Sequence, residues 1–318
     1  MKRLALAFSP LRDASPGDIV AWSKRAEALG YDAVFIPESF CDSLAYAQAV
    51  ALATSRIAVG TAITNVYLRQ PTLLAEQAAA VQVFSGGRLR LGLGVGHRAV
   101  NEPLGIQMTD PLGKIRTVIG TLRAGWTKGP HQPRPTTPPQ ILAAALAPRM
   151  VELAGELADG VIFNLFPLAR YPRALASLRR GAARAGRDAE GLEVCHFTTC
   201  YLADDRAAAL HEAKRMLARY ANLPYYGNML ATSGFADEVV AVRAAWAKRD
   251  VSAAEAAVTD EMADAVTLAG DPAYCRERLA AYRYAGATLP ILFTNPVGES
   301  RAAAVERTLV AFAEAVRD

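Results

Sequence analysis

Glu38 and His97 are the two ionisable residues of this sequence best placed to move a proton. Each follows a short apolar segment that predicts a β-strand: Glu38 comes after residues 32–37 (DAVFIP), and His97 comes after residues 86–96 (GGRLRLGLGVG). A carboxylate or an imidazole in such a position suits general acid–base catalysis. Two simpler roles stay open: Glu38 could pair with an arginine at the rim of the fold, and His97 could be a loop histidine bonded to backbone.

A glycine-rich segment, Gly92-x-Gly94-x-Gly96, ends the second of these strands. Its spacing is similar to the start of a dinucleotide-binding loop, but the sixth position is His97, and residues 98–105 (RAVNEPLG) predict an ordered loop where that motif needs a helix. Glycine removes the side chain where something approaches the backbone closely. The segment therefore favours a glycine-lined ligand pocket, with a crowded strand end that binds no ligand as the alternative.

The composition points away from several classes of protein. The chain has 318 residues, with 35 basic and 31 acidic side chains and no basic run with interleaved aromatic residues, so we expect no nucleic-acid partner. No apolar stretch approaches the ~20 residues of a membrane span, and the first apolar run is too short for a signal peptide. The four histidines lack metal-binding spacing and the four cysteines form no CxxC pair, so we expect no metal site and reduced thiols in a cytoplasmic protein.

Apolar strand-like segments alternate with helix-like segments along the chain. Eight strands, each followed by a helix, predict a parallel sheet closed into a (β/α)8 TIM barrel. A doubly wound sheet fits less well, because it would need fewer strands and a phosphate-binding loop after the first strand. We expect a single domain, residues 1–318, with residues 203–268 as a helical insertion after strand seven. The expected strands are residues 4–8, 32–37, 56–64, 86–98, 141–145, 161–164, 192–201 and 289–294.

In a barrel of this type the functional residues lie at the carboxyl ends of the strands. Here those ends carry small and apolar residues with few ionisable groups, which suits a flat organic ring better than a sugar or a metal. Residues 144–147 also run into a helix that Pro148 opens, and the free N–H groups of that helix could bind a phosphate. Close strand–helix packing would need the same small residues, so both readings stay open.

Four stretches in order resemble the bacterial luciferase-like monooxygenase superfamily, and in particular its branch of coenzyme F420 (deazaflavin)-dependent oxidoreductases. They are DAVFIPES (32–39), RIAVGTAITNVYLRQPTLLAEQAAAVQVFSGGRLRLGLGVGHRAVNEPLG (56–105), ILAAALAPRMVELAGELADGVIFN (141–164) and GDPAYCRERLAAYRYAG (270–286). The second stretch is the most specific, and residues 203–268 match least.

The resemblance implies a (β/α)8 barrel that binds a flavin or deazaflavin at the carboxyl ends of its strands. It implies a bulge with a non-prolyl cis peptide at Ala62–Ile63 behind the ring, and a phosphate-bearing tail beside the loop after strand five. It also implies that Asn101 contacts the cofactor. The expected cofactor-binding residues are Ser39, Ala62, Ile63, Thr64, Gly94, Gly96, Asn101, Ala144, Ala145, Leu146 and Ala147.

One departure from the family bears on catalysis. Some relatives carry an acid–histidine pair after strand two, where this chain has Glu38-Ser39. The sugar-phosphate dehydrogenase branch therefore fits poorly, and Glu38 or His97 must supply any proton transfer unless the substrate relies on solvent.

The resemblance implies an enzyme that transfers a hydride between coenzyme F420 and a small organic substrate, and a homodimer. One alternative is an FMN-dependent monooxygenase that takes reduced FMN from a partner reductase and reacts with oxygen. The other is a non-catalytic flavin-binding barrel. Tyr225, Tyr226 and Trp246 in the insertion are candidate pocket or lid aromatics, with ordinary helix packing as their alternative role.

Overall fold

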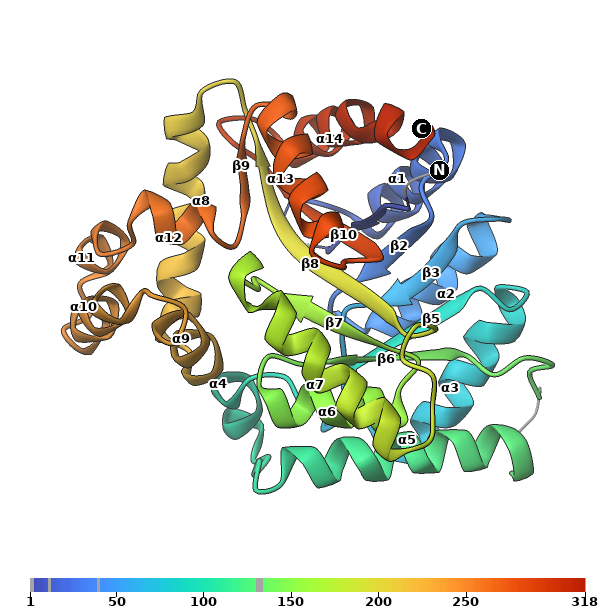
Figure 1. Cartoon of the computed structure of the whole chain (residues 1–318). Helices are drawn as coiled ribbons and strands as arrows, with labels where there is room; N and C mark the ends of the chain where they lie inside the picture. Colours follow the sequence, from blue (N-terminus) through green and yellow to red (C-terminus); the bar gives the residue numbers. More distant parts are fainter. Residues whose placement is uncertain (1–2, 11–12, 39–40, 130–133, 318) are drawn as a thin grey trace.

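The eight expected strands form one closed parallel barrel, as Figure 1 shows. The computed structural model describes residues 3–10, 13–38, 41–129 and 134–317. Neighbouring strands pair in parallel, and β10 pairs with both β1 and β8, which closes the sheet and confirms the (β/α)8 prediction. The barrel strands are β1 (Ala5–Ala7), β2 (Ala33–Ile36), β3 (Ala58–Thr61), β5 (Leu89–Gly94), β6 (Gln140–Ala144), β7 (Gly160–Asn164), β8 (Glu193–Leu202) and β10 (Leu289–Asn295).

Helices surround the barrel and cover the outer face of the sheet (Figure 1). The first of them has Ser15 as its N-cap, whose side chain accepts from the Asp18 N–H in a capping box. Its C-cap is Gly30, which has a φ of 92°. The surrounding helices are α1 (Pro16–Leu29), α2 (Ser43–Ala53), α3 (Pro71–Phe84), α5 (Pro111–Lys128), α6 (Pro148–Leu157), α7 (Tyr171–Arg184), α13 (Pro272–Tyr284) and α14 (Arg301–Arg317).

Both faces of the barrel sheet are buried in apolar layers, so the sequence of each strand is a nearly continuous hydrophobic run. One set of side chains packs outward against the helices, and a second set fills the barrel interior. The interior is crowded: a Cβ built on Gly60 would lie 2.4 Å from the ring of Phe35, so that ring needs glycine beside it. The interior residues are Ala5, Ala7, Ala33, Phe35, Leu142, Ile162, Cys195, Phe197, Leu289 and Ile291.

Ion pairs lie at the amino-terminal ends of the barrel strands. Arg3 pairs with Glu193 and with Asp32, whose Oδ1 lies 3.2 Å from Arg3 Nε. Arg90 Nη1 lies 3.5 Å from the second oxygen of Glu193. These charged side chains are paired with one another. We expect the ligand site at the opposite, carboxyl ends of the strands, which we call the mouth.

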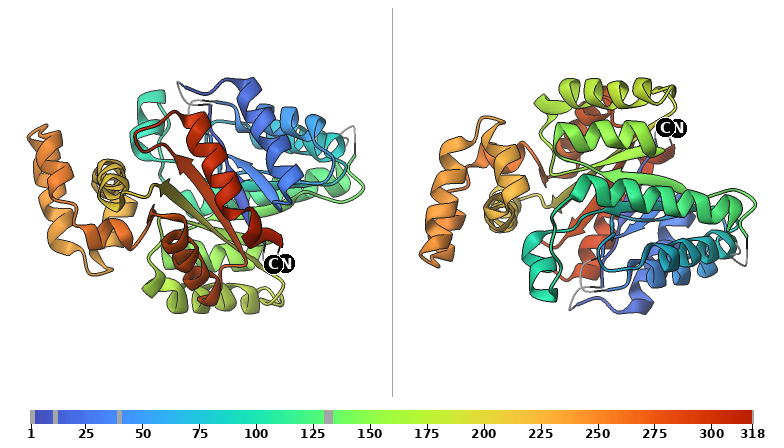
Figure 2. Two further views of the ribbon diagram at one scale, coloured as in Figure 1. Left: turned by 90° about the horizontal axis from the view of Figure 1, so that it is seen from above. Right: turned by 90° about the horizontal axis from the view of Figure 1, so that it is seen from below.

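The segment after β8 is helical and stands to one side of the barrel in both views of Figure 2. Its return differs from the prediction, because residues 268–270 form a short strand, β9 (Leu268–Gly270), beside the end of β8. The helices are α8 (Arg206–Asn222), α9 (Pro224–Ala231), α10 (Ala236–Ala247), α11 (Val251–Ala256) and α12 (Asp260–Asp264), and the short helix η2 (Leu168–Arg170) precedes α7.

Two local predictions near the mouth were wrong in detail. The expected third strand stops at Thr61 and resumes as β4 (Thr64–Asn65). The expected loop over residues 98–105 is helical, with α4 (Arg98–Asn101) and the 3₁₀ turn η1 (Glu102–Leu104), because the carbonyl of His97 accepts from the N–H groups of Val100 and Asn101. Among the described residues, no helix is long and apolar enough to cross a membrane.

Candidate active site

The mouth of the barrel has an apolar floor. Its side chains are only partly buried and pack against the residues that fill the barrel interior. They are Ala62, Ile63, Ala144 and Phe293. They come from the ends of β3, β6 and β10. This surface fits a flat, largely apolar ring.

The backbone between β3 and β4 bends over this floor, and we call residues 61–65 the bulge. It contains the predicted cis peptide bond at Ala62–Ile63. The Ala62 N–H donates to the carbonyl of Ile36 at 3.0 Å, so the end of β2 fixes one side of the bulge. On the other side, Thr64 and Asn65 pair with Leu93 and Gly94 of β5.

The glycines of β5 make room for the bulge. A Cβ on Gly92 would lie 1.9 Å from the carbonyl oxygen of Thr61, and a Cβ on Gly94 would lie 2.6 Å from Ile63 Cγ1. Gly96 has a φ of +65°, and a Cβ there would lie 2.6 Å from Asn65 Nδ2. The chain that approaches these glycines is therefore the protein's own third strand, and it crowds the end of β5.

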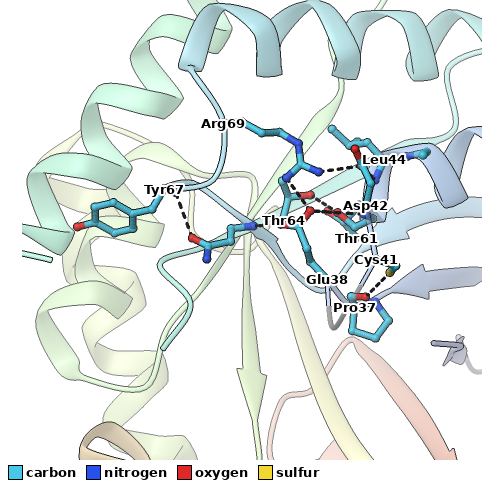
Figure 3. Close-up of polar contacts among 12 residues, drawn as sticks. Pro37, Glu38, Cys41, Asp42, Leu44, Thr61, Thr64, Tyr67 and Arg69 are labelled. Carbon is cyan, nitrogen blue, oxygen red and sulfur yellow. Dashed lines mark hydrogen bonds and ion pairs between the residues drawn. The ribbon is translucent and has the colours of Figure 1, made fainter. Parts of the chain in front are cut away.

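Glu38 contacts the bulge, the start of α2 and Arg69 (Figure 3). Its Oε1 forms an ion pair with Arg69 Nη1 at 2.6 Å and accepts from the Ser43 hydroxyl at 3.2 Å. Its Oε2 accepts from the backbone N–H of Asn65 at 2.6 Å. Of the two roles open for Glu38, the arginine-paired one describes this geometry.

Arg69 joins Glu38 to the start of α2. Its Nη2 lies 2.7 Å from Oδ1 of Asp42, which also caps α2 by accepting from the N–H groups of Leu44 and Ala45 (Figure 3). Thr64 is fully buried, and its hydroxyl bonds to the Ser43 hydroxyl at 2.9 Å. The loop after β4, the start of α2 and the bulge are thus tied together by polar contacts.

Asn101 lies behind the loop that leaves β5 and is fully buried. Its Oδ1 accepts from Asn65 Nδ2 at 2.8 Å, and its Nδ2 donates to the carbonyl of Val95 at 2.9 Å. The same amide contacts Met108 Sδ at 3.2 Å. These contacts make Asn101 part of the framework that joins the loop to the bulge, and its direct contact with a cofactor stays a prediction.

His97 lies where the insertion meets the barrel. Its ring is 5.7 Å from the ring of Tyr226 and 6.3 Å from that of Tyr220, centroid to centroid. Tyr226 in turn accepts a hydrogen bond from Asn164 Nδ2, at the end of β7, at 2.6 Å. Burial lowers the pKa of His97, so its imidazole is mostly neutral at neutral pH.

The other candidate aromatics of the insertion differ from one another. Trp246 donates to the carbonyl of Ala218 at 2.9 Å, so it packs within the insertion as its alternative role implies. Tyr225 is 38 % exposed. Tyr226, by contrast, is buried and bonded to Asn164 at the end of β7.

The segment after β6 leads into α6 with no side-chain cap. Ala145 is buried, whereas Ala147 is exposed and stands at the cap position of the helix. Leu146 between them is partly exposed. An uncapped first turn that opens with Pro148 leaves backbone N–H groups for an anion, which keeps the phosphate reading in place.

Sequence reasoning missed three side chains of the site and named one that lies outside the described residues. The latter is Ser39. The missed side chains are Arg69, Tyr220 and Phe293. Only Phe293 had a usable signal, since it lies near the carboxyl end of the expected strand 289–294. Among the described residues, no group of three or more His, Cys, Asp or Glu side chains could hold a metal ion.

Comparison with known proteins places this geometry in context. A family model described as luciferase-like monooxygenase matches residues 5–289. A 5,10-methylenetetrahydromethanopterin reductase from Methanolobus tindarius is 29% identical over 305 residues, covering 91% of this chain and 93% of the relative.

Two solved structures share the fold. A coenzyme F420-dependent tetrahydromethanopterin reductase from Methanopyrus kandleri superposes with a TM-score of 0.80 at 22% identity, covering 97% of each chain. An F420-dependent secondary alcohol dehydrogenase, in complex with an F420–acetone adduct, gives a TM-score of 0.80 at 19% identity over 100% of both chains.

Proposed function

Because the chain belongs to the luciferase-like monooxygenase family, we propose that it is an oxidoreductase that transfers a hydride between coenzyme F420 and a small organic substrate. The observation that carries this proposal is the apolar floor of Ala62, Ile63, Ala144 and Phe293 at the mouth of the barrel. The reductase relative and the two F420-dependent structures support the choice of cofactor.

The residues present fit such a cofactor. Ala62 and Ile63 would support the ring from behind, and residues 144–147, with the uncapped start of α6, would take the phosphate-bearing tail. The bulge and the loop after β5 would position the cofactor. They are held in place by contacts of Gly94, Gly96, Thr64 and Asn101. When bound, the cofactor supplies the hydride-accepting or hydride-donating carbon.

His97 is the group that we propose moves a proton. It lies between the barrel and the insertion, and its lowered pKa leaves the ring neutral and able to accept a proton at neutral pH. The ring of Tyr226, whose hydroxyl accepts a hydrogen bond from Asn164, lies beside the His97 imidazole. A homodimer in the cytoplasm is part of the same proposal, and sedimentation of the purified protein measures the oligomeric state.

Titration with the cofactor tests the proposal. The intrinsic fluorescence and absorbance of F420 should change saturably when the protein is added, and FMN should bind more weakly. Tight binding of FMN together with no binding of F420 would overturn the assignment.

The family's description as luciferase-like monooxygenase favours a monooxygenase as the second candidate, and for it we propose FMN as the cofactor. That enzyme would take reduced FMN from a partner reductase. It would consume oxygen in the presence of reduced FMN and substrate, whereas the F420 enzyme would not, so an oxygen electrode separates the two.

A further inference from the structure

We infer that Glu38 and Arg69 form a positioning pair that holds the bulge in the shape that receives the cofactor, and that Glu38 therefore does not transfer the proton. The inference rests on the proposed function. It concerns a carboxylate that the sequence placed among the catalytic candidates and an arginine that the sequence did not single out.

The first observation is that both oxygens of the carboxylate are in use. Oε1 contacts Arg69 and Ser43, and Oε2 accepts from the Asn65 N–H. The side chain of Glu38 is only 5% exposed, and that of Arg69 only 10%. A carboxylate has about four lone-pair sites, and these contacts use most of them on a side chain that is almost fully buried, so Glu38 is poorly placed to reach a substrate proton.

The second observation is that the end of β2 holds both sides of the bulge. The carbonyl of Ile36 accepts from the Ala62 N–H at 3.0 Å, and Glu38, two residues further on, accepts from the Asn65 N–H at 2.6 Å. The residues between these two anchors include Ala62 and Ile63 of the apolar floor. Loss of the second anchor would weaken the hold on one side of that floor, which would then rest on the pairing of Thr64 and Asn65 with β5 and on the side-chain bonds of these two residues.

The third observation is that Arg69 has two acidic partners with different surroundings. Glu38 is buried and bonds to the Asn65 N–H of the bulge, while Asp42 is 46% exposed and caps α2. Arg69 therefore compensates the buried charge of Glu38 and fixes the direction of its carboxylate. Asp42 provides a matched control that shares the arginine.

The main variant is Glu38→Gln. If the glutamine oxygen faces Asn65, its NH₂ group faces the guanidinium of Arg69; if the oxygen faces Arg69, the NH₂ group faces the Asn65 N–H. Either orientation sets a donor against a donor. We expect the dissociation constant for F420, measured by fluorescence titration, to rise about tenfold or more. Asp42→Asn keeps a good helix cap and should change it less than about twofold.

A rescue variant separates positioning from proton transfer. In the double variant E38Q/R69Q the second glutamine can accept from the first, so Gln at position 38 can again turn its oxygen toward the Asn65 N–H. We expect this double variant to bind F420 more tightly than E38Q alone. A proton-transferring Glu38 predicts the opposite pattern, in which E38Q binds F420 as the wild type does and fails only in turnover.

Amide hydrogen exchange at Asn65 gives a readout that needs no cofactor. In the free protein the Asn65 N–H should exchange faster in E38Q than in the wild type and in D42N. If E38Q does not fold, the milder variant R69K, which keeps the charge but contacts one carboxylate at a time, replaces it in both measurements.

The results of these measurements separate failure of the proposed function from failure of the positioning role of Glu38. A wild-type protein that does not bind F420, whether or not it binds FMN, overturns the proposed function, and this inference with it. A wild type that binds F420, together with an E38Q variant that binds it equally well and protects Asn65 equally well, overturns the positioning role alone.

Discussion

Gly94 lies directly against Ile63, so that a Cβ built on the glycine would stand 2.6 Å from Ile63 Cγ1. Glycine on the fourth barrel strand thus lets the third strand fold into the mouth. The same relation holds at Gly92, where the neighbour is the carbonyl oxygen of Thr61 at 1.9 Å. The glycine-rich segment is explained by contact within the protein, and its effect on a bound cofactor passes through the bulge.

Alanine at these glycines should destabilise the protein in a defined order. Gly92→Ala meets backbone, which cannot move aside, so we expect a loss of about 3 kcal/mol or more in the free energy of unfolding. Gly94→Ala meets a side chain and should lose about 1–3 kcal/mol. Gly120→Ala in α5, where no atom lies within 4 Å of the new Cβ, should be neutral or slightly stabilising. Urea unfolding measures all three, and equal losses at Gly92 and Gly120 would contradict the packing argument.

Arg88 precedes β5, at the end of the barrel opposite the mouth, and is predicted to contribute strongly to stability. Burial lowers its pKa, and its guanidinium donates to backbone carbonyl groups that close the turns around β3: those of Ala51, Thr54, Ile57 and Ser85. Arg88→Met would leave these buried acceptors without a donor, and we expect a loss of about 3 kcal/mol or more. Arg179→Met, at a 61% exposed side chain, should stay within about 0.5 kcal/mol in the same urea assay.

His196 should make the protein less stable in acid. Its ring is fully buried, and burial, with a smaller effect from Arg278, lowers its pKa to about 3. In the unfolded chain the pKa is about 6.5, so the unfolded state binds the extra proton between these values and stability falls as the pH falls. From pH 7 to pH 5 this group alone should remove about 2 kcal/mol.

The control for this prediction is His196→Gln, which can still bond to the Tyr171 hydroxyl that now lies 2.9 Å from His196 Nδ1. Because other groups titrate equally in both proteins, the difference between their pH dependences isolates His196. An identical fall from pH 7 to pH 5 in the two proteins would show that His196 is charged in the folded state.

The bond between Tyr226 and Asn164 should contribute to the docking of the insertion on the barrel. Tyr226→Phe keeps the ring beside His97 but removes the acceptor of the Asn164 amide. A double-mutant cycle with Asn164→Ala should give a coupling free energy of about 0.5–1.5 kcal/mol. Tyr284→Phe, at a side chain that is 96% exposed, should change stability by less than about 0.5 kcal/mol. A coupling of zero would mean that the insertion docks without this bond.

The sequence predicted the barrel because its signals are local. Strands buried on both faces read as apolar runs, as in residues 32–37, and the helices between them begin with recognisable caps such as Ser15. The resemblance added the cis bond at Ala62–Ile63, which no local pattern indicates. Short elements were less predictable: α4 depends on two bonds to one carbonyl, and β9 depends on the end of β8 as its partner.

Tertiary structure decided what each functional candidate touches. Glu38 and Arg69 are 31 positions apart, and His97 and Tyr226 are 129 apart, so closure of the barrel and docking of the insertion bring them together. No local pattern encodes such a pairing, because propensity and periodicity act over a few residues only. The sequence established that something approaches the backbone at Gly94, since glycine leaves space there. Only the fold showed that Ile63 occupies that space, because the identity of a neighbour is a property of the packed chain.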